Sequence, residues 1–202
     1  NGVSANNQQL LLLTDGQVTF KGEAGTTTVP LGSMVIGSQV IQPSVLNFVG
    51  NVYASSMVAN VQSFSSDKSI TLSGSSGLVI NSKGSVSIGS SNGGTVLTTT
   101  NRGDVSITNQ GSLAINGNFN LDGSFTQLGT GSVTLGNISQ PATLLNFNTN
   151  SRPITFSSEV KLVQDSQINA NSLGLVGLGG SITFKSSVVG SRNVQLTAGV
   201  GD

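Results

Sequence analysis

The chain carries few side chains that could do acid, base or metal chemistry. Its 202 residues include eight acidic and eight basic side chains, but no His and no Cys. Paired carboxylates can hydrolyse glycosides, and clustered carboxylates can hold calcium, but both require acids that converge. No two of the acids lie closer than six residues in the sequence: Asp15, Glu23, Asp67, Asp104, Asp122, Glu159, Asp165 and Asp202.

Asp104 and Asp122 are separated by nearly the length of one repeat and could stack on one face of a repetitive fold. Each is next to a glycine, which is typical of a turn residue, and we interpret both in this way. Without His there is no base of the usual kind at neutral pH, and the serines lack a partner for nucleophilic catalysis. We therefore expect no enzymatic activity, no catalytic residue, no cofactor and no metal site.

The composition favours strands joined by turns. Gly, Ser, Asn and Thr supply 98 of the 202 residues, 36% of the residues are apolar, and only 8% are charged. A helical bundle needs more Ala, Glu, Lys, Leu and Arg, and a nucleic-acid binder needs a basic excess, whereas the net charge here is zero. The longest aliphatic run, residues 10–13, is too short to span a membrane, so we expect no membrane insertion.

Short triplets with a small polar residue between two apolar ones recur along the chain. Each triplet would place two apolar side chains on the same face of a strand. The clearest triplets are residues 18–20, 70–72, 86–88, 105–107, 133–135, 154–156, 182–184 and 194–196.

From Ile70 onward these triplets recur at short, uneven intervals. Such spacing is typical of a solenoid in which each coil contributes a few short strands. An antiparallel sandwich would also show short strands with frequent turns, so the spacing leaves it as an alternative. We expect about ten coils of roughly twenty residues, which gives a rod on the order of 50 Å long.

Three of the triplets end in Thr-Phe, and their alignment makes Phe20, Phe156 and Phe184 equivalent core residues that face inward. The chain has eight Phe, one Tyr and no Trp. Most of the Phe residues lie in expected strands together with Val, Leu or Ile, and we expect them to stack inside the solenoid.

Residues 10–38 and 152–202 contain the most similar phrases, including "GQVTFKGEAG", "RPITFSSEVK" and "GSITFKSSVV". These phrases resemble the repeats of filamentous-haemagglutinin-like adhesins and of autotransporter passengers, which are bacterial surface exoproteins. The resemblance implies an all-β, right-handed parallel β-helix, with residues 1–202 forming one elongated domain. It also implies a segment of a much longer, repetitive protein that is exported and displayed at the bacterial cell surface.

Two functions fit this resemblance. The first is a non-enzymatic extracellular rod or stalk, and the alternative is a self-assembling filament, sheath or surface-layer subunit. The partners would be other copies, bound through coil ends or lateral faces, or a receptor on a host or neighbouring cell. Arg102, Gly103 and Asp104 spell the tripeptide that integrins bind in some proteins and are the one candidate binding site, although Gly-Asp before a strand is also an ordinary turn.

Overall fold

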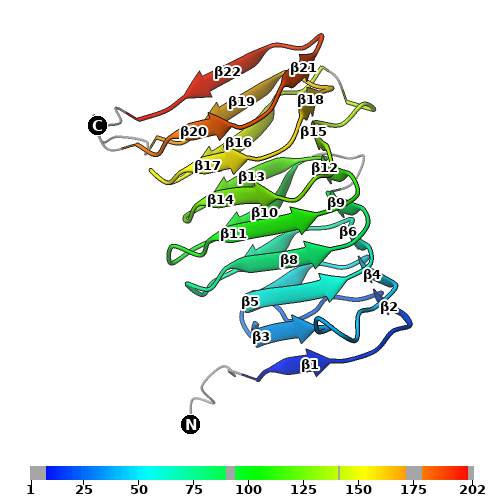
Figure 1. Ribbon diagram of the computed structural model, residues 1–202. Coiled ribbons are helices and arrows are strands. Elements are labelled where there is room, and N and C mark those ends of the chain that lie inside the picture. Colours follow the sequence, from blue (N-terminus) through cyan, green and yellow to red (C-terminus); the bar gives the residue numbers. More distant parts are fainter. Residues whose placement is uncertain (1–7, 90–93, 141, 172–178, 200–202) are drawn as a thin grey trace.

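The computed structural model describes residues 8–89, 94–140, 142–171 and 179–199, and within these ranges it is all β, without a helix. Its strands form a 14-stranded and an 8-stranded sheet in which neighbouring strands are parallel. The chain winds upward as a single elongated β-solenoid of about seven coils (Figure 1). Parallel pairing throughout both sheets excludes the antiparallel sandwich.

The solenoid has three faces. From β8 onward each strand pairs with the strand three places further along the chain, so three consecutive strands belong to three different faces. Face A is one arm of the large sheet, in which the second half of β5 pairs with β8. It consists of β1 (Leu10–Leu12), β3 (Leu31–Ile36), β5 (Val52–Val61), β8 (Leu78–Ser82), β11 (Val105–Asn109), β14 (Phe125–Leu128), β17 (Ile154–Phe156) and β20 (Ile182–Phe184).

Face B is the other arm of the large sheet, and the first half of β5 joins it by pairing with β7. Its further strands are β7 (Ile70–Leu72), β10 (Thr95–Thr99), β13 (Asn118–Leu121), β16 (Leu145–Thr149), β19 (Ser166–Asn169) and β22 (Val194–Thr197).

Face C is the 8-stranded sheet. It consists of β2 (Gln17–Phe20), β4 (Val45–Phe48), β6 (Phe64–Ser66), β9 (Val86–Ile88), β12 (Leu113–Ile115), β15 (Val133–Leu135), β18 (Val160–Leu162) and β21 (Val188–Gly190). All eight triplets predicted from the sequence lie in strands of the three faces, so this prediction is confirmed.

The core runs inside the three faces for the length of the stack. Side chains alternate between the two sides of a strand, so in β11 Val105 and Ile107 are buried while Ser106 is half-buried. Residues at this place in successive coils of face A are Leu10, Met34, Met57, Leu78, Val105, Phe125, Ile154 and Ile182.

The expectation of about ten coils of roughly twenty residues is wrong, because the solenoid has about seven coils. The coil that runs from Val105 to Phe125 is short, whereas the next coil, from Phe125 to Ile154, is nearly half as long again. The sequence intervals suggested too many coils because several of them join strands on different faces of one coil. About seven coils, at a strand spacing of about 4.8 Å, give a stack about 34 Å long.

All eight Phe side chains face the interior and form two groups of rings in contact. Phe20, Phe48 and Phe64 stack along face C, while the second group joins faces A and B. The second group consists of Phe119, Phe125, Phe147, Phe156 and Phe184.

The expected equivalence of the three Thr-Phe triplets holds for two of them. Phe156 and Phe184 are in register on face A, with ring centroids 5.4 Å apart. Phe20 instead lies on face C, in register with Phe48, so its alignment with the other two is wrong. Phe156 is fully buried, whereas Phe20 and Phe184 are half-buried in coils nearer the ends of the stack.

A buried amide joins three coils at the corner between faces A and C. The Gln127 Oε1 atom accepts hydrogen bonds from the backbone N–H groups of Ser157 and Ser158 in the next coil, at 2.9 and 3.2 Å. Its Nε2 donates to Asn109 Oδ1 in the preceding coil at 2.8 Å. These bonds satisfy turn groups that the sheet ladders leave unpaired.

Among the described residues there is no helix with the length and apolarity needed to cross a membrane.

Candidate functional site

The corner between faces A and B holds the tripeptide singled out in the sequence. Residues 100–104 connect β10 to β11, and Asn101 and Arg102 adopt left-handed backbone angles there, with φ of 52° and 61°. The Gly103 residue is buried, while Arg102 and Asp104 are exposed. Asp104 precedes β11 directly, as a turn residue should.

The carboxylate of Asp104 bonds to the neighbouring coil. Its Oδ1 atom accepts hydrogen bonds from the backbone N–H of Ser124 at 2.7 Å and from the Ser124 hydroxyl at 2.8 Å. Asp104 therefore fastens the turn between β13 and β14, which is a structural role. Recognition of a receptor by Arg102, Gly103 and Asp104 stays a prediction.

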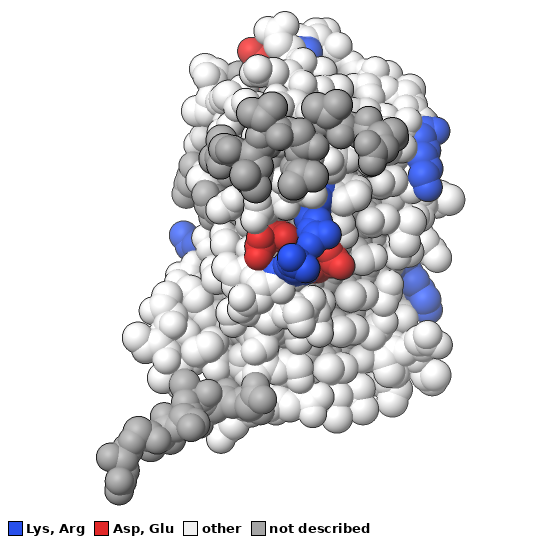
Figure 2. Space-filling view, turned by 90° about the vertical axis from the view of Figure 1, so that its left-hand side faces the viewer, with Lys and Arg blue, Asp and Glu red and all other residues white. Residues whose placement is uncertain are grey.

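Asp122 fastens the same corner from the next coil. Its carboxylate accepts hydrogen bonds from the Asn150 amide at 2.7 Å and from the backbone N–H of Arg102 at 2.8 Å. These two bonds, together with the nearby charges of Arg102 and Arg152, hold the pKa of Asp122 below its ordinary value. Figure 2 shows this side of the molecule, where acidic and basic side chains gather in one small group on a largely uncharged surface.

Asp104 and Asp122 thus meet at one corner, but each is occupied by hydrogen bonds from a turn. No group of three or more acids that could hold a metal ion occurs among the described residues. The two carboxylates therefore have a structural role, which is to link adjacent coils by hydrogen bonds.

A hollow with polar walls lies beside this corner, on the outer surface of face B. It has a volume of about 540 Å³ and runs across β13, β16 and β19. We call it the amide groove. The residues that line it are Thr99, Asn120, Leu121, Asp122, Asn146, Asn148, Thr149, Asn150, Gln167, Asn169 and Asn171.

A repeated triplet builds the amide groove. Residues 118–120, 146–148 and 167–169 each place an amide side chain on both sides of a large apolar residue, and the apolar residue is buried. Because side chains alternate along a strand, burying the central residue turns both amides outward. Parallel register then aligns them in rows, with Asn120, Asn148 and Asn169 adjacent in three successive coils.

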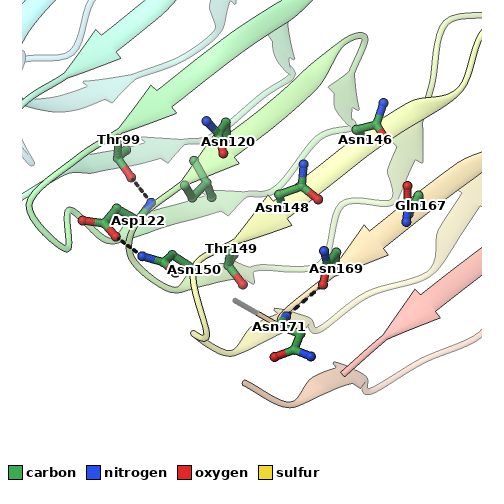
Figure 3. A pocket seen from close by; sticks show the side chains of 11 residues that line it. Thr99, Asn120, Asp122, Asn146, Asn148, Thr149, Asn150, Gln167, Asn169 and Asn171 are labelled. Atoms are coloured by element: carbon green, nitrogen blue, oxygen red, sulfur yellow. Dashed lines mark hydrogen bonds between the residues drawn. The ribbon is translucent and has the colours of Figure 1, made fainter. Parts of the chain in front are cut away.

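The second row of the amide groove pairs Asn146 with Gln167. Asn118 lies next to Asn146 in this row, where its Oδ1 atom accepts a hydrogen bond from the Asn146 backbone N–H at 2.8 Å. Figure 3 shows the rows side by side, with Asp122 and Asn150 at one edge of the groove.

The amides in the groove are not satisfied by one another. The side chains of Asn120, Asn148 and Gln167 make no hydrogen bond with any residue that the structure describes, and no bond links them in Figure 3. Some polar side chains on the other faces are bonded from coil to coil. On face A, Asn81 Nδ2 donates to Asn60 Oδ1 at 3.0 Å, and on face C the Ser65 hydroxyl donates to Asn47 Oδ1 at 2.9 Å.

Asn171 closes one end of the groove. Its backbone N–H donates to Asn169 Oδ1 at 2.9 Å, which holds the two residues together. Its side-chain oxygen is buried and has no hydrogen-bond partner among the described residues. An unpaired buried acceptor is costly in a folded protein, so it marks a place where a further donor would be favourable.

The sequence analysis missed these residues. The signal was present, because "NFN" occurs at residues 118–120 and 146–148 and "QIN" follows at residues 167–169. The two intervals between these triplets differ in length, and the expectation of coils of roughly twenty residues does not bring the three triplets into one row.

Comparisons with protein-family models, with curated proteins and with solved structures found no match to this chain. The parallel β-solenoid is compatible with β-helix repeat proteins in general.

Proposed function

We propose that the chain is a non-enzymatic structural rod or stalk, displayed outside the cell as part of a bacterial adhesin-like surface exoprotein. The observation that supports this proposal is the continuous core of a stack whose coils pair with the coils directly above and below. A stack of this kind can gain or lose coils without a new core, which suits a spacer that holds other parts of a protein away from the cell. The resemblance of residues 10–38 and 152–202 to exoprotein repeats supports the surface location.

The acids support the non-enzymatic part of the proposal. Asp104 and Asp122 hold turns of the adjacent coil or backbone, so neither is free to act as a general acid or base. The chain also lacks His and Cys. The carboxylates of Asp104 and Asp122 instead hold adjacent coils in register at this corner.

A second candidate function is self-assembly into a filament, sheath or surface layer. It is favoured by the coil that contains β21 and β22, where Val188, Val189, Val194 and Leu196 are exposed. Further solenoid, from the same chain or from another copy, would cover these side chains and pair with the free strand edges.

Antibodies against the chain, applied to intact cells that produce it, test the location. We expect surface labelling that equals the labelling of permeabilised cells, whereas labelling only after permeabilisation would overturn the proposal. Electron microscopy of the purified chain then separates the two functions. Isolated short rods support the stalk, and ordered polymers support the self-assembling subunit.

A further inference from the structure

We propose that the amide groove on face B binds a neutral oligosaccharide chain through its side-chain amides. This inference goes beyond the rod function and does not rest on it. The two proposals can fail separately: the chain could be a stalk that binds no ligand, or it could bind a ligand without being a stalk.

The groove offers unpaired hydrogen-bonding groups in an ordered array. Each Asn or Gln amide presents two N–H donors and one oxygen acceptor. Asn120, Asn148 and Gln167 use none of these groups toward described residues, whereas some polar side chains on the other faces bond to each other. The groups are therefore available to a ligand that both donates and accepts.

The sheet backbone beneath the groove is already satisfied. The N–H and C=O groups of β13, β16 and β19 pair with the strands above and below them. A ligand on this face can be held only by side chains, so an extended peptide cannot add to the sheet there. The only apolar side chain in the described lining is that of Leu121, which gives a peptide side chain little to pack against.

The charge of the groove favours a neutral ligand. Asp122 is its only charged lining residue among those described, and its carboxylate is already bonded to Asn150 and Arg102. No Lys or Arg of the described chain lines the groove, although Arg102 and Arg152 lie near Asp122 outside it, so an anionic ligand would find no cation among the lining residues. A single bonded carboxylate is also too little for a metal ion.

The spacing of the amides allows each of them to meet a ring of a sugar chain. The rows step by one strand, about 4.8 Å, along the solenoid axis, and the two rows are about 6.6 Å apart along each strand. One strand step is close to the width of a pyranose ring, and neighbouring hydroxyls of such a ring can accept from an amide N–H and donate to the amide oxygen. The volume of about 540 Å³ lies within the range of ligand sites in proteins.

No aromatic ring of the described chain lines the groove, so binding would depend on several hydrogen bonds and would be sensitive to the loss of one amide.

Titration of the ¹⁵N-labelled chain with cellohexaose and with maltohexaose, followed by the NMR signals of side-chain amides, tests the proposal. We expect at least one of these two neutral probes to shift the signals of Asn120, Asn148 and Gln167, and a hexamer of galacturonic acid to bind more weakly. Asn148→Ala and, separately, Gln167→Ala should weaken binding at least tenfold.

Asn81→Ala is the matched control, because it removes an amide of the same kind from face A and should leave the dissociation constant within twofold. Circular dichroism of each variant checks that it is folded. The proposal is overturned if neither neutral probe shifts the groove amides, or if Asn81→Ala weakens binding as much as Asn148→Ala. It is also overturned if the ligand-free chain is an oligomer that Asn148→Ala dissociates, because the groove would then be occupied by a second copy.

Discussion

At the scale of single residues, burial separates aromatic side chains that look identical in the sequence. Phe156 is enclosed by Phe125, Phe147 and Phe184 and is fully buried. Phe20 belongs to the same Thr-Phe triplet pattern but remains half-buried on face C.

Phe156→Ala should therefore lower the free energy of unfolding by about 3 to 5 kcal/mol, since it removes a fully packed ring. Phe20→Ala should cost less, because part of its ring already contacts solvent. Urea titrations of the two variants beside the unmodified chain measure both values. Equal losses would show that burial at position 20 matches that at position 156.

The Asp122 carboxylate gives the corner a dependence on acid. Its pKa in the folded chain is lowered, mainly by the Asn150 hydrogen bond and then by the Arg102 backbone N–H, with further attraction from Arg102 and Arg152. A lowered pKa stabilises the folded state above the ordinary value of 3.8, and this contribution is lost as the pH falls through the lowered value.

The stability of Asp122→Asn should thus fall less steeply than that of the unmodified chain as the pH drops below 3.8. The cause is that the variant has no proton to take up at position 122. Thermal unfolding at a series of pH values measures this difference. Identical acid profiles for the two proteins would contradict the assigned hydrogen bonds.

At the scale of elements, side chains at the corners between faces hold the strands in register. Gln127 has this role, whereas Gln167 lies on the outer surface and does not. Gln127 points into a corner and bonds to the backbone N–H groups of Ser157 and Ser158 in one adjacent coil and to Asn109 Oδ1 in the other. Gln167 points outward from β19 into the amide groove and bonds to no described residue.

Gln127→Leu should cost about 2 to 4 kcal/mol, because it leaves the part-buried N–H groups of Ser157 and Ser158 without their acceptor. Gln167→Leu is the same chemical change on the open surface and should alter stability by no more than about 0.5 kcal/mol. Chemical denaturation of both variants makes the comparison. A cost at position 167 equal to that at position 127 would refute the contrast.

Local alternation is the part of the fold that the sequence predicts well. Val105, Ser106 and Ile107 specify a strand and its inward side without reference to any other residue. The same pattern does not specify a face, which is why Val18-Thr19-Phe20 was placed with Ile154-Thr155-Phe156 although the two lie on different sheets. The face is decided by the length of the turns between strands, and these lengths vary from coil to coil.

The candidate site was harder to predict for a related reason. Asn120, Asn148 and Asn169 are far apart in the sequence and become neighbours only through the register of β13, β16 and β19. Asp104 and Asp122 were correctly interpreted as turn residues, because the glycine beside each marks the turn locally.

At the scale of the whole molecule, the stack should tolerate the removal of a complete coil. Val105 and Phe125 occupy the same place in consecutive coils, so deleting residues 105–124 brings β14 against β8 in the original register. We expect a folded, β-rich chain that is shorter by about one strand spacing, roughly 4.8 Å. Circular dichroism and small-angle X-ray scattering measure these two properties.

Deleting residues 105–114 is the control, because it removes only part of a coil and moves later strands onto the wrong faces. This variant should aggregate or lose its cooperative unfolding transition. If both deletions behave alike, the coils are not independent modules.

The uneven coil length has a mechanical consequence. Strands lie across the stack, so a pull applied at its two ends would open the ladder bonds of one coil at a time, as in a zipper, instead of shearing many at once. The short coil between Val105 and Phe125 releases up to about 70 Å of extended chain, and the long coil between Phe125 and Ile154 up to about 100 Å. Under tension the molecule would lengthen in unequal steps and absorb sudden load. The coils that had not yet opened would stay folded.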